Sequence, residues 1–335
     1  MVALGSEPLR WLRPLSWVYG LGVRARNAGF EFGWPRVRKL PIPVVSVGNL
    51  SVGGTGKTPF VAWFVGQCRS AGLRVGVLAR GYGRRSGEDL NDEGRLLAGR
   101  FPQLPQEQDG DRYAAGVRLL ARDELDLIVL DDGFQHRRLH RDLDVCLLDA
   151  RMPFGDGLLP AGWLREPASA LRRADVCVLT GCDGVDAAAR GEARALVAAA
   201  APGKPVFCAA QRPLDVVVLP SGESEPAPSL DGRRVFLLAA IARPERFRAS
   251  VVGLGAEVVG EEFLRDHARI SPTRLAEAAA GAASARAVLL LTEKDEARLA
   301  LPAGAGPDRC VLRIALEFDA APQLRSFLPP CLRGQ

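Results

Sequence analysis

The 335-residue chain is poor in residue types on which several functional classes of protein depend. It contains three histidines and three tyrosines, and aromatic residues make up 6% of it. So few histidines sharply limit any histidine-based metal or acid–base site, and so few aromatics disfavour a nucleic-acid-binding surface. What the chain does have is 47% hydrophobic and 25% charged residues, the composition of a folded globular protein. We therefore expect a compact protein with no nucleic-acid partner.

Paired cysteines and long apolar runs are also missing. The seven cysteines are scattered without a C-x-x-C pair, which argues against a disulfide framework or a zinc site and indicates reduced thiols in the cytoplasm. No apolar run reaches the roughly 18 residues that a membrane-spanning helix needs. Residues 14–23 resemble the apolar part of a signal peptide, but Arg24 and Arg26 stand where a small-residue cleavage site is expected. We therefore do not expect export.

The order of hydrophobic segments predicts two α/β domains. From about residue 43, short β-branched runs alternate with longer amphipathic or Ala-rich segments, as in the βαβ units of a parallel sheet. Strands are predicted in a first set over 43–48, 74–79, 125–130, 143–149, 175–180 and 205–210, and in a second, smaller set over 233–240, 256–260, 286–292 and 309–316. Helices are predicted over 57–71, 110–122, 186–201, 244–253, 271–283 and 293–300.

A stretch rich in proline, glycine and serine separates the two sets of strands. It covers residues 211–232 and is typical of a domain boundary or hinge. We therefore expect an N-terminal segment over 1–39, a larger domain over 40–212 and a smaller α/β domain over 213–335.

A glycine-rich loop lies between the first predicted strand and the first predicted helix. Residues 51–58 read Ser-Val-Gly-Gly-Thr-Gly-Lys-Thr, which fits the P-loop pattern G-x-x-x-x-G-K-[ST] at every position but the first. In a P-loop, backbone N–H groups and the helix N-terminus face the phosphates of a nucleotide, while the lysine adds its charge and the threonine hydroxyl binds Mg²⁺. The predicted nucleotide-binding residues are Gly53, Gly54, Thr55, Gly56, Lys57 and Thr58, of which Lys57 is also a predicted catalytic residue and Thr58 a predicted metal ligand.

A second element of phosphate-transferring enzymes follows the strand predicted over 125–130. Asp131 and Asp132 stand at its end, and one of them is expected to hold Mg²⁺ directly or through water; Asp132 is also a predicted catalytic residue. Alone, such a pair most often forms a turn or a helix cap, but the P-loop favours the metal role. Arg80 and Asp149 also follow predicted strands, so these residues converge on the edge where open α/β sheets bind ligands.

The predicted fold class is α/β, with a P-loop NTPase-type, mostly parallel sheet flanked by helices. A second, smaller α/β domain follows it, and an amphipathic helical segment precedes it. A GTPase is disfavoured because residues 292–295 (Thr-Glu-Lys-Asp) have the lysine one position late for a guanine-reading motif. A partitioning-type ATPase is disfavoured because Val52 stands where its additional lysine is expected. A membrane-recruited P-loop ATPase that acts on a protein partner is the alternative function.

Taken together, the motifs resemble the tetraacyldisaccharide 4′-kinase family, the lipid A 4′-kinases. The resemblance covers nearly the whole chain, and the string Asp-Asp-Gly-Phe-Gln-His of residues 131–136 is more specific than a P-loop alone. Ser51 belongs to the pattern of this family. The other matching strings are residues 46–59, 80–82, 139–142, 159–162, 164–167 and 292–295.

The resemblance implies a phosphotransferase that uses ATP and Mg²⁺. Its acceptor would be the 4′-hydroxyl of a tetraacylated glucosamine disaccharide 1-phosphate, which gives lipid IVA in lipid A biosynthesis. It further implies a peripheral enzyme at the cytoplasmic face of the inner membrane, with the active site in a cleft between the larger and the smaller domain. No obligate protein partner is expected.

The resemblance also assigns roles to individual residues. Asp92 is the expected base on the sugar hydroxyl, assisted by His267, although the residues that flank each of them differ from the family pattern. Without the resemblance, Asp92 would be an ordinary residue beside a helix near 93–99 and His267 an ordinary loop residue. Glu166 is a further expected ligand of Mg²⁺. The expected substrate-binding residues are Asn49, Arg80, Tyr82, His136 and Arg165.

The net charge of +5 comes entirely from residues 1–39. This segment holds seven basic and two acidic residues, and the rest of the chain is neutral. It also holds three of the five tryptophans, and a helix would place one apolar face along it, made of Trp11, Leu12, Leu15, Val18 and Tyr19. An apolar aromatic face beside arginines predicts a helix that lies in a membrane interface. The alternative is a helix docked on the core of the protein itself.

Overall fold

The computed structural model describes residues 10–84, 89–266, 268–299, 301, 305–320 and 322–333. The chain forms two compact units. Unit 1 consists of Met1–Tyr82, Gln103–Gln211 and Leu316–Gln335, and unit 2 of Gly83–Pro102 and Arg212–Ala315. The domain boundary predicted after residue 212 thus lies one residue beyond Gln211, where a segment of unit 1 ends. The segment Gly83–Pro102, however, belongs with the C-terminal part of the chain, and the C-terminal tail belongs with the P-loop part.

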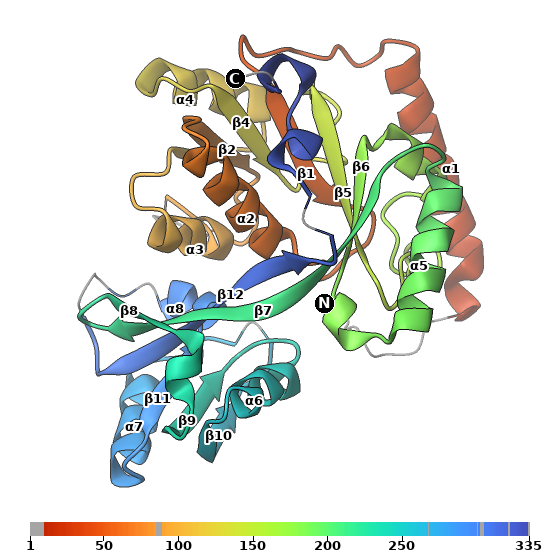
Figure 1. Cartoon of the computed structure of the whole chain (residues 1–335). Helices are drawn as coiled ribbons and strands as arrows, with labels where there is room; N and C mark the ends of the chain where they lie inside the picture. The colour runs from red at the N-terminus through yellow and green to blue at the C-terminus, as the bar shows by residue number, and fades with distance from the viewer. Residues whose placement is uncertain are drawn as a thin grey trace. The chain divides into compact units, whose positions relative to one another are not determined.

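Unit 1 is built on a parallel sheet with the strand order β7-β6-β5-β1-β4-β2-β3 (Figure 1). Its strands are β1 (Val44–Asn49), β2 (Val75–Ala79), β3 (Gln106–Gln108), β4 (Leu127–Asp131), β5 (Leu143–Asp149), β6 (Val176–Thr180) and the first part of β7 (Val206–Leu219). Every residue of β1 and β4 is buried, as expected for strands covered on both faces. The strands predicted for the larger domain are therefore confirmed, whereas the short polar edge strand β3 was not predicted.

Helices cover both faces of this sheet. The larger elements are α1 (Arg13–Glu31), α2 (Lys57–Ser70), α4 (Arg112–Arg122) and α5 (Ala187–Ala200), with short 3-10 helices over Arg10–Leu12, Ala168–Arg173, Cys182–Gly184, Leu324–Phe327 and Pro330–Leu332. Residues paired in register on neighbouring strands lie on the same face of the sheet. Val44 and Ile128 are paired in this way and pack with α4, and Cys146 and Cys177 are paired in this way and pack with α5. Helix α2 packs against β1 and β4.

An aromatic cluster explains why the C-terminal tail belongs to unit 1. The ring of Phe327, from the tail, lies 5.4 Å from that of Phe60 in α2 and 5.4 Å from that of Phe207 in β7. Trp63 of α2 also packs against Phe318, with 4.8 Å between ring centroids and the rings tilted by 53°. Large aromatic side chains bury much apolar surface, so these contacts hold the tail against α2. The spacing of single aromatics along the sequence does not reveal which distant helix they cover.

Unit 2 is a smaller α/β unit. Its strand order is β10-β9-β11-β12-β7, in which β9 pairs in parallel with β10 and β11, β11 pairs in parallel with β12, and β8 pairs antiparallel with β7. Its elements are α3 (Asp92–Arg100), β8 (Glu223–Pro226), a 3-10 helix (Ala227–Leu230), β9 (Arg234–Ala239), α6 (Pro244–Gly253), β10 (Glu257–Phe263), α7 (Pro272–Ser284), β11 (Val288–Thr292), α8 (Glu293–Leu299) and β12 (Arg309–Phe318). The strands and helices predicted for the smaller domain are confirmed. The expected hinge over 211–232 is instead mostly the continuation of β7 and its hairpin with β8.

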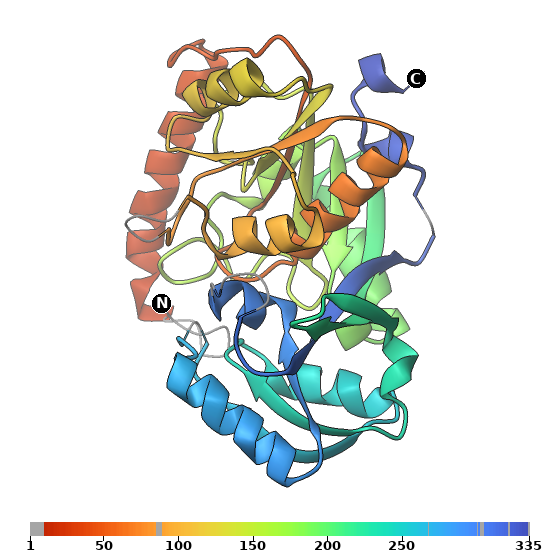
Figure 2. The same ribbon diagram turned by 90° about the vertical axis from the view of Figure 1, so that its left-hand side faces the viewer.

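The predicted N-terminal helix is present as α1. In both Figure 1 and Figure 2 it runs along the edge of unit 1. None of the helices in the described ranges is both long and apolar enough to span a membrane. The predicted α/β fold class, with a mostly parallel P-loop sheet and a second α/β unit, is confirmed.

Candidate active site

The loop between β1 and α2 is held in place at Thr55. The side-chain nitrogen of Asn49 donates a hydrogen bond to Thr55 Oγ1 at 2.7 Å, and Thr180 Oγ1 donates to the Thr55 carbonyl oxygen at 2.9 Å. Gly56 caps α2 in the left-handed region, at φ 70°, which favours glycine. No side chain caps the first turn of α2, so its N–H groups face the space where a P-loop binds phosphate. Asn49 was predicted to bind substrate, and the contact described here gives it a role in holding the loop.

The Asp-Asp motif lies directly beside this loop. β1 and β4 pair in parallel with Val47 opposite Asp131, which places both motifs at the carboxyl edge of the sheet. A side chain at Gly48 would bring its Cβ within 2.6 Å of the backbone nitrogen of Phe134, so only glycine permits this approach. Asp132 has φ 51°, a left-handed conformation that is uncommon for a residue with a side chain. The backbone is therefore strained at the residue that faces the P-loop lysine.

Two cations hold the carboxylate of Asp132. Lys57 Nζ lies 3.3 Å from Asp132 Oδ1, and a guanidinium nitrogen of Arg165 lies 3.0 and 3.1 Å from the two carboxylate oxygens. Burial raises the pKa of Asp132, but the charges of Lys57 and Arg165 outweigh it and leave the pKa below its ordinary value. Three residues predicted separately from the sequence thus form one charged cluster, which we call the Lys57–Asp132–Arg165 cluster.

Arg165 reaches this cluster from a segment that is bonded to the P-loop. Its backbone nitrogen donates to the carbonyl oxygen of Leu50 at 2.7 Å, and the nitrogen of Val52 donates to the carbonyl oxygen of Trp163 at 2.8 Å. Glu166 comes next and is fully buried. Its carboxylate accepts hydrogen bonds from Asn27, at 2.8 Å, and from Arg173, at 3.1 Å. These contacts give Glu166 a structural role, and its predicted role as a metal ligand stays a prediction.

The residues around the Asp-Asp motif suit a hard cation. The Thr58 hydroxyl and the carboxylates of Asp131 and Asp132 are oxygen ligands, the type that Mg²⁺ prefers. Asp131 is buried at the end of β4, and Thr58 is half-buried in the first turn of α2. Across the part of the chain that the structure describes, three or more His, Cys, Asp or Glu side chains nowhere gather to hold a metal by themselves.

His136 and the arginines around it form the cationic side of the site. Burial, together with the charges of Arg112 and Arg141, lowers the pKa of His136 to about 4, so the imidazole is neutral at neutral pH. Arg112 is itself buried, and burial and the nearby charge of Arg80 lower its pKa. Arg112 could not be identified from the sequence, because an arginine in the first turn of a helix looks like a solvent-exposed residue. Tyr82, predicted to bind substrate, is 79% exposed at the end of a segment of unit 1.

The predicted base lies in unit 2, at the first position of α3. Asn91 caps this helix, and its side chain accepts a hydrogen bond from the nitrogen of Gly94 at 3.0 Å. The Asp92 carboxylate contacts Arg95 at 2.6 Å and Arg298 at 3.1 Å, both within unit 2. His267, predicted to assist Asp92, lies outside the described residues. The catalytic role of both stays a prediction.

A P-loop beside paired aspartates, at the carboxyl edge of a parallel sheet, defines a P-loop phosphate-binding protein. Comparison with known proteins identifies the family. The profile of the tetraacyldisaccharide-1-P 4′-kinase family, LpxK, matches residues 8–332. The chain therefore belongs to this family, as its motifs predicted, and it is a kinase.

Individual relatives agree with this assignment. The tetraacyldisaccharide 4′-kinase of Anaeromyxobacter sp. (strain Fw109-5) is 42% identical over 328 residues, which cover 92% of this chain and 88% of that protein. The enzyme of the same name from Geobacter metallireducens is 41% identical over 310 residues, covering 87% and 88%. The crystal structure of "apo" form LpxK from Aquifex aeolicus in complex with ATP is similar with a TM-score of 0.75 at 30% identity, covering 92% of this chain and 95% of that one.

Proposed function

We propose that this chain transfers the γ-phosphate of ATP to the 4′-hydroxyl of tetraacyldisaccharide 1-phosphate and so makes lipid IVA. The observation that carries the proposal is the Lys57–Asp132–Arg165 cluster beside the P-loop, in a chain of the tetraacyldisaccharide 4′-kinase family. Phosphoryl transfer asks a protein mainly to clamp the phosphates and to stabilise the charge of the transition state. Two cations and a helix N-terminus at one sheet edge supply that chemistry.

Within the cluster, Lys57 and Arg165 act on the phosphates. Each cation is paired with Asp132, and each can turn from this carboxylate to a phosphate oxygen, since both are charge-assisted donors. The backbone N–H groups of Gly53, Gly54, Thr55 and Gly56 add neutral donors to the same anion. Bound Mg²⁺ would neutralise negative charge that develops on the phosphates. Thr58, together with Asp131 or Asp132, would hold the ion, and Glu166 is a further candidate ligand.

Asp92 is proposed as the base that accepts the proton of the acceptor hydroxyl, with His267 beside it. A carboxylate can accept this proton late in the reaction, and an adjacent histidine can adjust its basicity and orientation. Arg95 and Arg298 fix the orientation of the Asp92 side chain, which supports a defined position for such a base.

Contact with the lipid acceptor is proposed for a second group of residues. Arg80 is an exposed cation just beyond β2 and Tyr82 is an exposed aromatic residue, so the two suit a sugar phosphate. His136 is neutral and can act as a hydrogen-bond partner of the substrate without adding charge. Asn49 is proposed to affect substrate binding indirectly, because its side chain holds the P-loop at Thr55.

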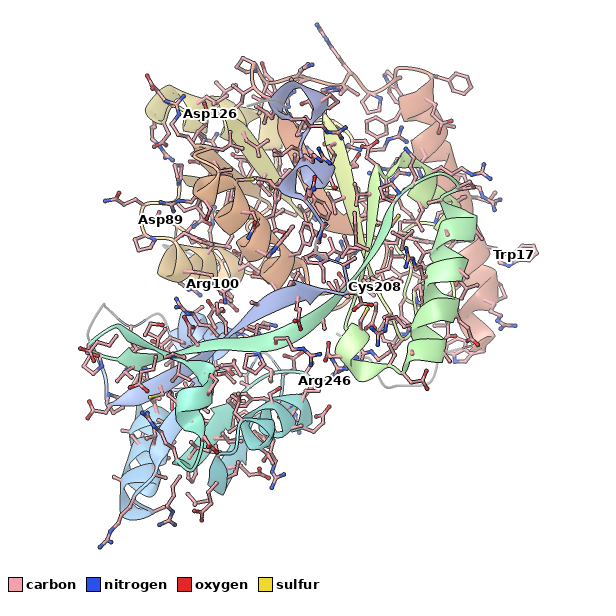
Figure 3. The ribbon with its side chains drawn as sticks, in the orientation of Figure 1. Trp17, Asp89, Arg100, Asp126, Cys208 and Arg246 are labelled. Carbon is pink, nitrogen blue, oxygen red and sulfur yellow. The ribbon has the colours of Figure 1, made fainter. Side chains whose placement is uncertain are left out.

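The outer face of α1 is proposed to lie on the cytoplasmic surface of the inner membrane. Leu15, Trp17, Val18 and Leu21 are all exposed on this helix, as is Trp11 in the 3-10 helix that precedes it, and Figure 3 shows Trp17 projecting outward from α1. At 3.6 residues per turn, Arg13 and Arg24 flank this apolar face on one side and Arg26 on the other. Arginines beside an apolar stripe complement anionic headgroups, which supports a lipid surface rather than a protein core as the partner.

Phosphate transfer can be tested directly. Purified full-length chain is mixed with ATP labelled at the γ-phosphate, Mg²⁺ and tetraacyldisaccharide 1-phosphate in detergent micelles, and the lipid is extracted. We expect label in a more polar lipid that carries a second phosphate. If folded protein that binds ATP yields no labelled lipid, the proposed acceptor is wrong; hydrolysis of ATP that depends on an added protein would then favour a P-loop ATPase.

A further inference from the structure

The two faces of helix α1 differ sharply in their side chains. The outer face carries the large apolar residues described above, whereas the buried residues are the small Ser16, Gly20 and Val23. A Cβ at Gly20 would already lie 3.0 Å from Leu158, so the helix packs closely on the segment around that residue. Ser16 Oγ donates a hydrogen bond to the carbonyl oxygen of Leu158 at 3.0 Å and accepts one from the nitrogen of Ala161 at 3.0 Å.

Two further residues of α1 bond directly to the segment that supplies the charged cluster. Tyr19 donates its hydroxyl to the carbonyl oxygen of Arg165 at 2.9 Å, and Asn27 donates its amide to the buried carboxylate of Glu166 at 2.8 Å. Burial, together with the charge of Glu166, raises the pKa of Tyr19, which keeps its hydroxyl a donor. The residue that contacts Asp132 therefore receives part of its backbone support from the N-terminal helix.

A second connection leads from α1 to the same loop. Arg26 donates to the carbonyl oxygen of Gln135, and the Gln135 amide donates to the carbonyl oxygen of Asn49 at 2.8 Å. Asn49 in turn holds Thr55 of the P-loop. Both connections lie within unit 1, so the lipid-facing helix and the phosphate-binding loop are joined by continuous hydrogen bonds.

Hydrogen bonds make up much of the contact between α1 and this segment. Two of the three buried residues of α1, Ser16 and Gly20, are small, and Ser16, Tyr19 and Asn27 bond to the segment directly. The docked helix leads directly into Phe32 and Trp34, which are both exposed. When α1 is docked, a bilayer can contact the outer face of the helix and these two rings at the same time. Bilayer binding therefore favours the docked arrangement.

We propose that Tyr19 and Asn27 are positioning residues that couple lipid binding on α1 to nucleotide binding at the P-loop. The proposal rests on the proposed membrane contact of α1. Docking of the helix holds Arg165 and Glu166 where the charged cluster needs them, so lipid raises the affinity for nucleotide. Linkage is reciprocal, so nucleotide raises the affinity for lipid by the same factor.

The test is nucleotide binding with and without a bilayer. The affinity of the full-length chain for Mg²⁺ and a non-hydrolysable ATP analogue is measured in buffer and with vesicles of phosphatidylethanolamine and phosphatidylglycerol, and vesicle binding is measured by co-sedimentation. For the unaltered chain we expect vesicles to tighten nucleotide binding by about fivefold or more. Tyr19→Phe combined with Asn27→Ala should lose most of this factor while still binding vesicles through the unaltered outer face of α1. Tyr113→Phe, at a ring that stacks on Arg38, is the matched control and should keep the factor.

Each contrary outcome has a distinct meaning. Vesicle binding by the unaltered chain without any change in nucleotide affinity would overturn the coupling and leave the membrane contact standing. A full vesicle effect in the folded double variant would overturn the assignment to Tyr19 and Asn27. Failure of the unaltered chain to bind vesicles would overturn the membrane contact and the coupling with it, while phosphate transfer in micelles would still test the proposed reaction separately.

Discussion

Two carboxylates proposed to act in the reaction are each held by two cations, but the cations differ in what else they bind. In unit 1, Asp132 contacts Lys57 and Arg165, and 38% of its side chain is exposed. In unit 2, Asp92 contacts Arg95 and Arg298, and only 6% of the Arg298 side chain is exposed.

The difference lies in the surroundings of Arg298. Its guanidinium also donates to the carbonyl oxygen of Ala240 at 2.6 Å and lies 3.5 Å from the buried Asp295, so it is part of the core of unit 2. Lys57 instead lies at a helix N-terminus, where an incoming phosphate can replace the carboxylate. A carboxylate between two cations is therefore suited to ligand exchange in one place and to rigidity in the other.

Removal of the lysine on the Asp132 side should have the largest effect. Lys57→Ala deletes a cation that is proposed to stabilise transition-state charge, so we expect kcat/KM to fall roughly a thousandfold with little change in folding. Radiolabelled phosphate transfer measures the activity. Lys39→Ala removes a largely exposed lysine that pairs with Asp142 and is the matched control. Near-normal activity of Lys57→Ala would mean that the ion pair between Lys57 and Asp132 has a purely structural role.

In unit 2, one substitution at Asp92 distinguishes a catalytic role of this residue from a structural one. Asp92→Asn keeps the size of the side chain but removes the proposed base, so we expect kcat to fall about a hundredfold while KM for ATP changes little. Asp89→Asn, at an exposed residue of the same unit (Figure 3), is the control. A lower unfolding temperature with near-normal kcat in the folded protein would make Asp92 a structural partner of Arg298 instead.

A third prediction concerns His136, whose pKa is lowered first by burial and then by the charges of Arg112 and Arg141. Its pKa is lowered from 6.5 to about 4, so between these pH values the unfolded chain binds a proton that the folded chain does not. Stability that is present above pH 6.5 should therefore decrease as the pH falls toward 4, by up to about 3 kcal/mol from this residue. Urea unfolding at several pH values measures it.

The matched pair for this measurement is His136→Gln and His140→Gln. His136→Gln should flatten the pH dependence of stability over this range, whereas His140→Gln replaces a histidine that is 41% exposed and should keep it. Equal pH dependence in the unaltered chain and in His136→Gln would mean that other groups cause the loss of stability, and that His136 is not surrounded by uncompensated positive charge.

The smallest expected effect concerns the helix behind Arg165. Trp17→Ala removes a ring that is 80% exposed, so vesicle affinity should fall about tenfold through loss of interfacial burial. Leu196→Ala, which truncates an exposed leucine of α5, should leave vesicle affinity unchanged. Co-sedimentation with anionic vesicles measures both. Equal losses in the two variants would point to nonspecific adsorption.

Most of the fold could be predicted because its signals are local. The β1 and β4 strands are continuous apolar runs, and the P-loop glycines and lysine stand between a strand and a helix in sequence. The short strand β3 was missed because Gln106–Gln108 has neither apolar alternation nor β-branched residues. The membership of Gly83–Pro102 in unit 2 was missed because it depends on contacts over long sequence separation, such as that between Arg95 and the carbonyl oxygen of Ala297.

The sequence by itself determined which residue types are available, their spacing, and the family to which the chain belongs. Only the tertiary structure decided which of them meet: Lys57 and Arg165 on one carboxylate, Asn27 on the buried Glu166, and Tyr19 on the backbone of Arg165. The physical reason is that secondary structure follows from neighbours along the chain, whereas a buried polar group takes its hydrogen-bond partner from whichever element folds against it. The motifs therefore indicate the chemistry, whereas the packing of α1 on residues 158–166 decides which contacts hold the motif residues in place.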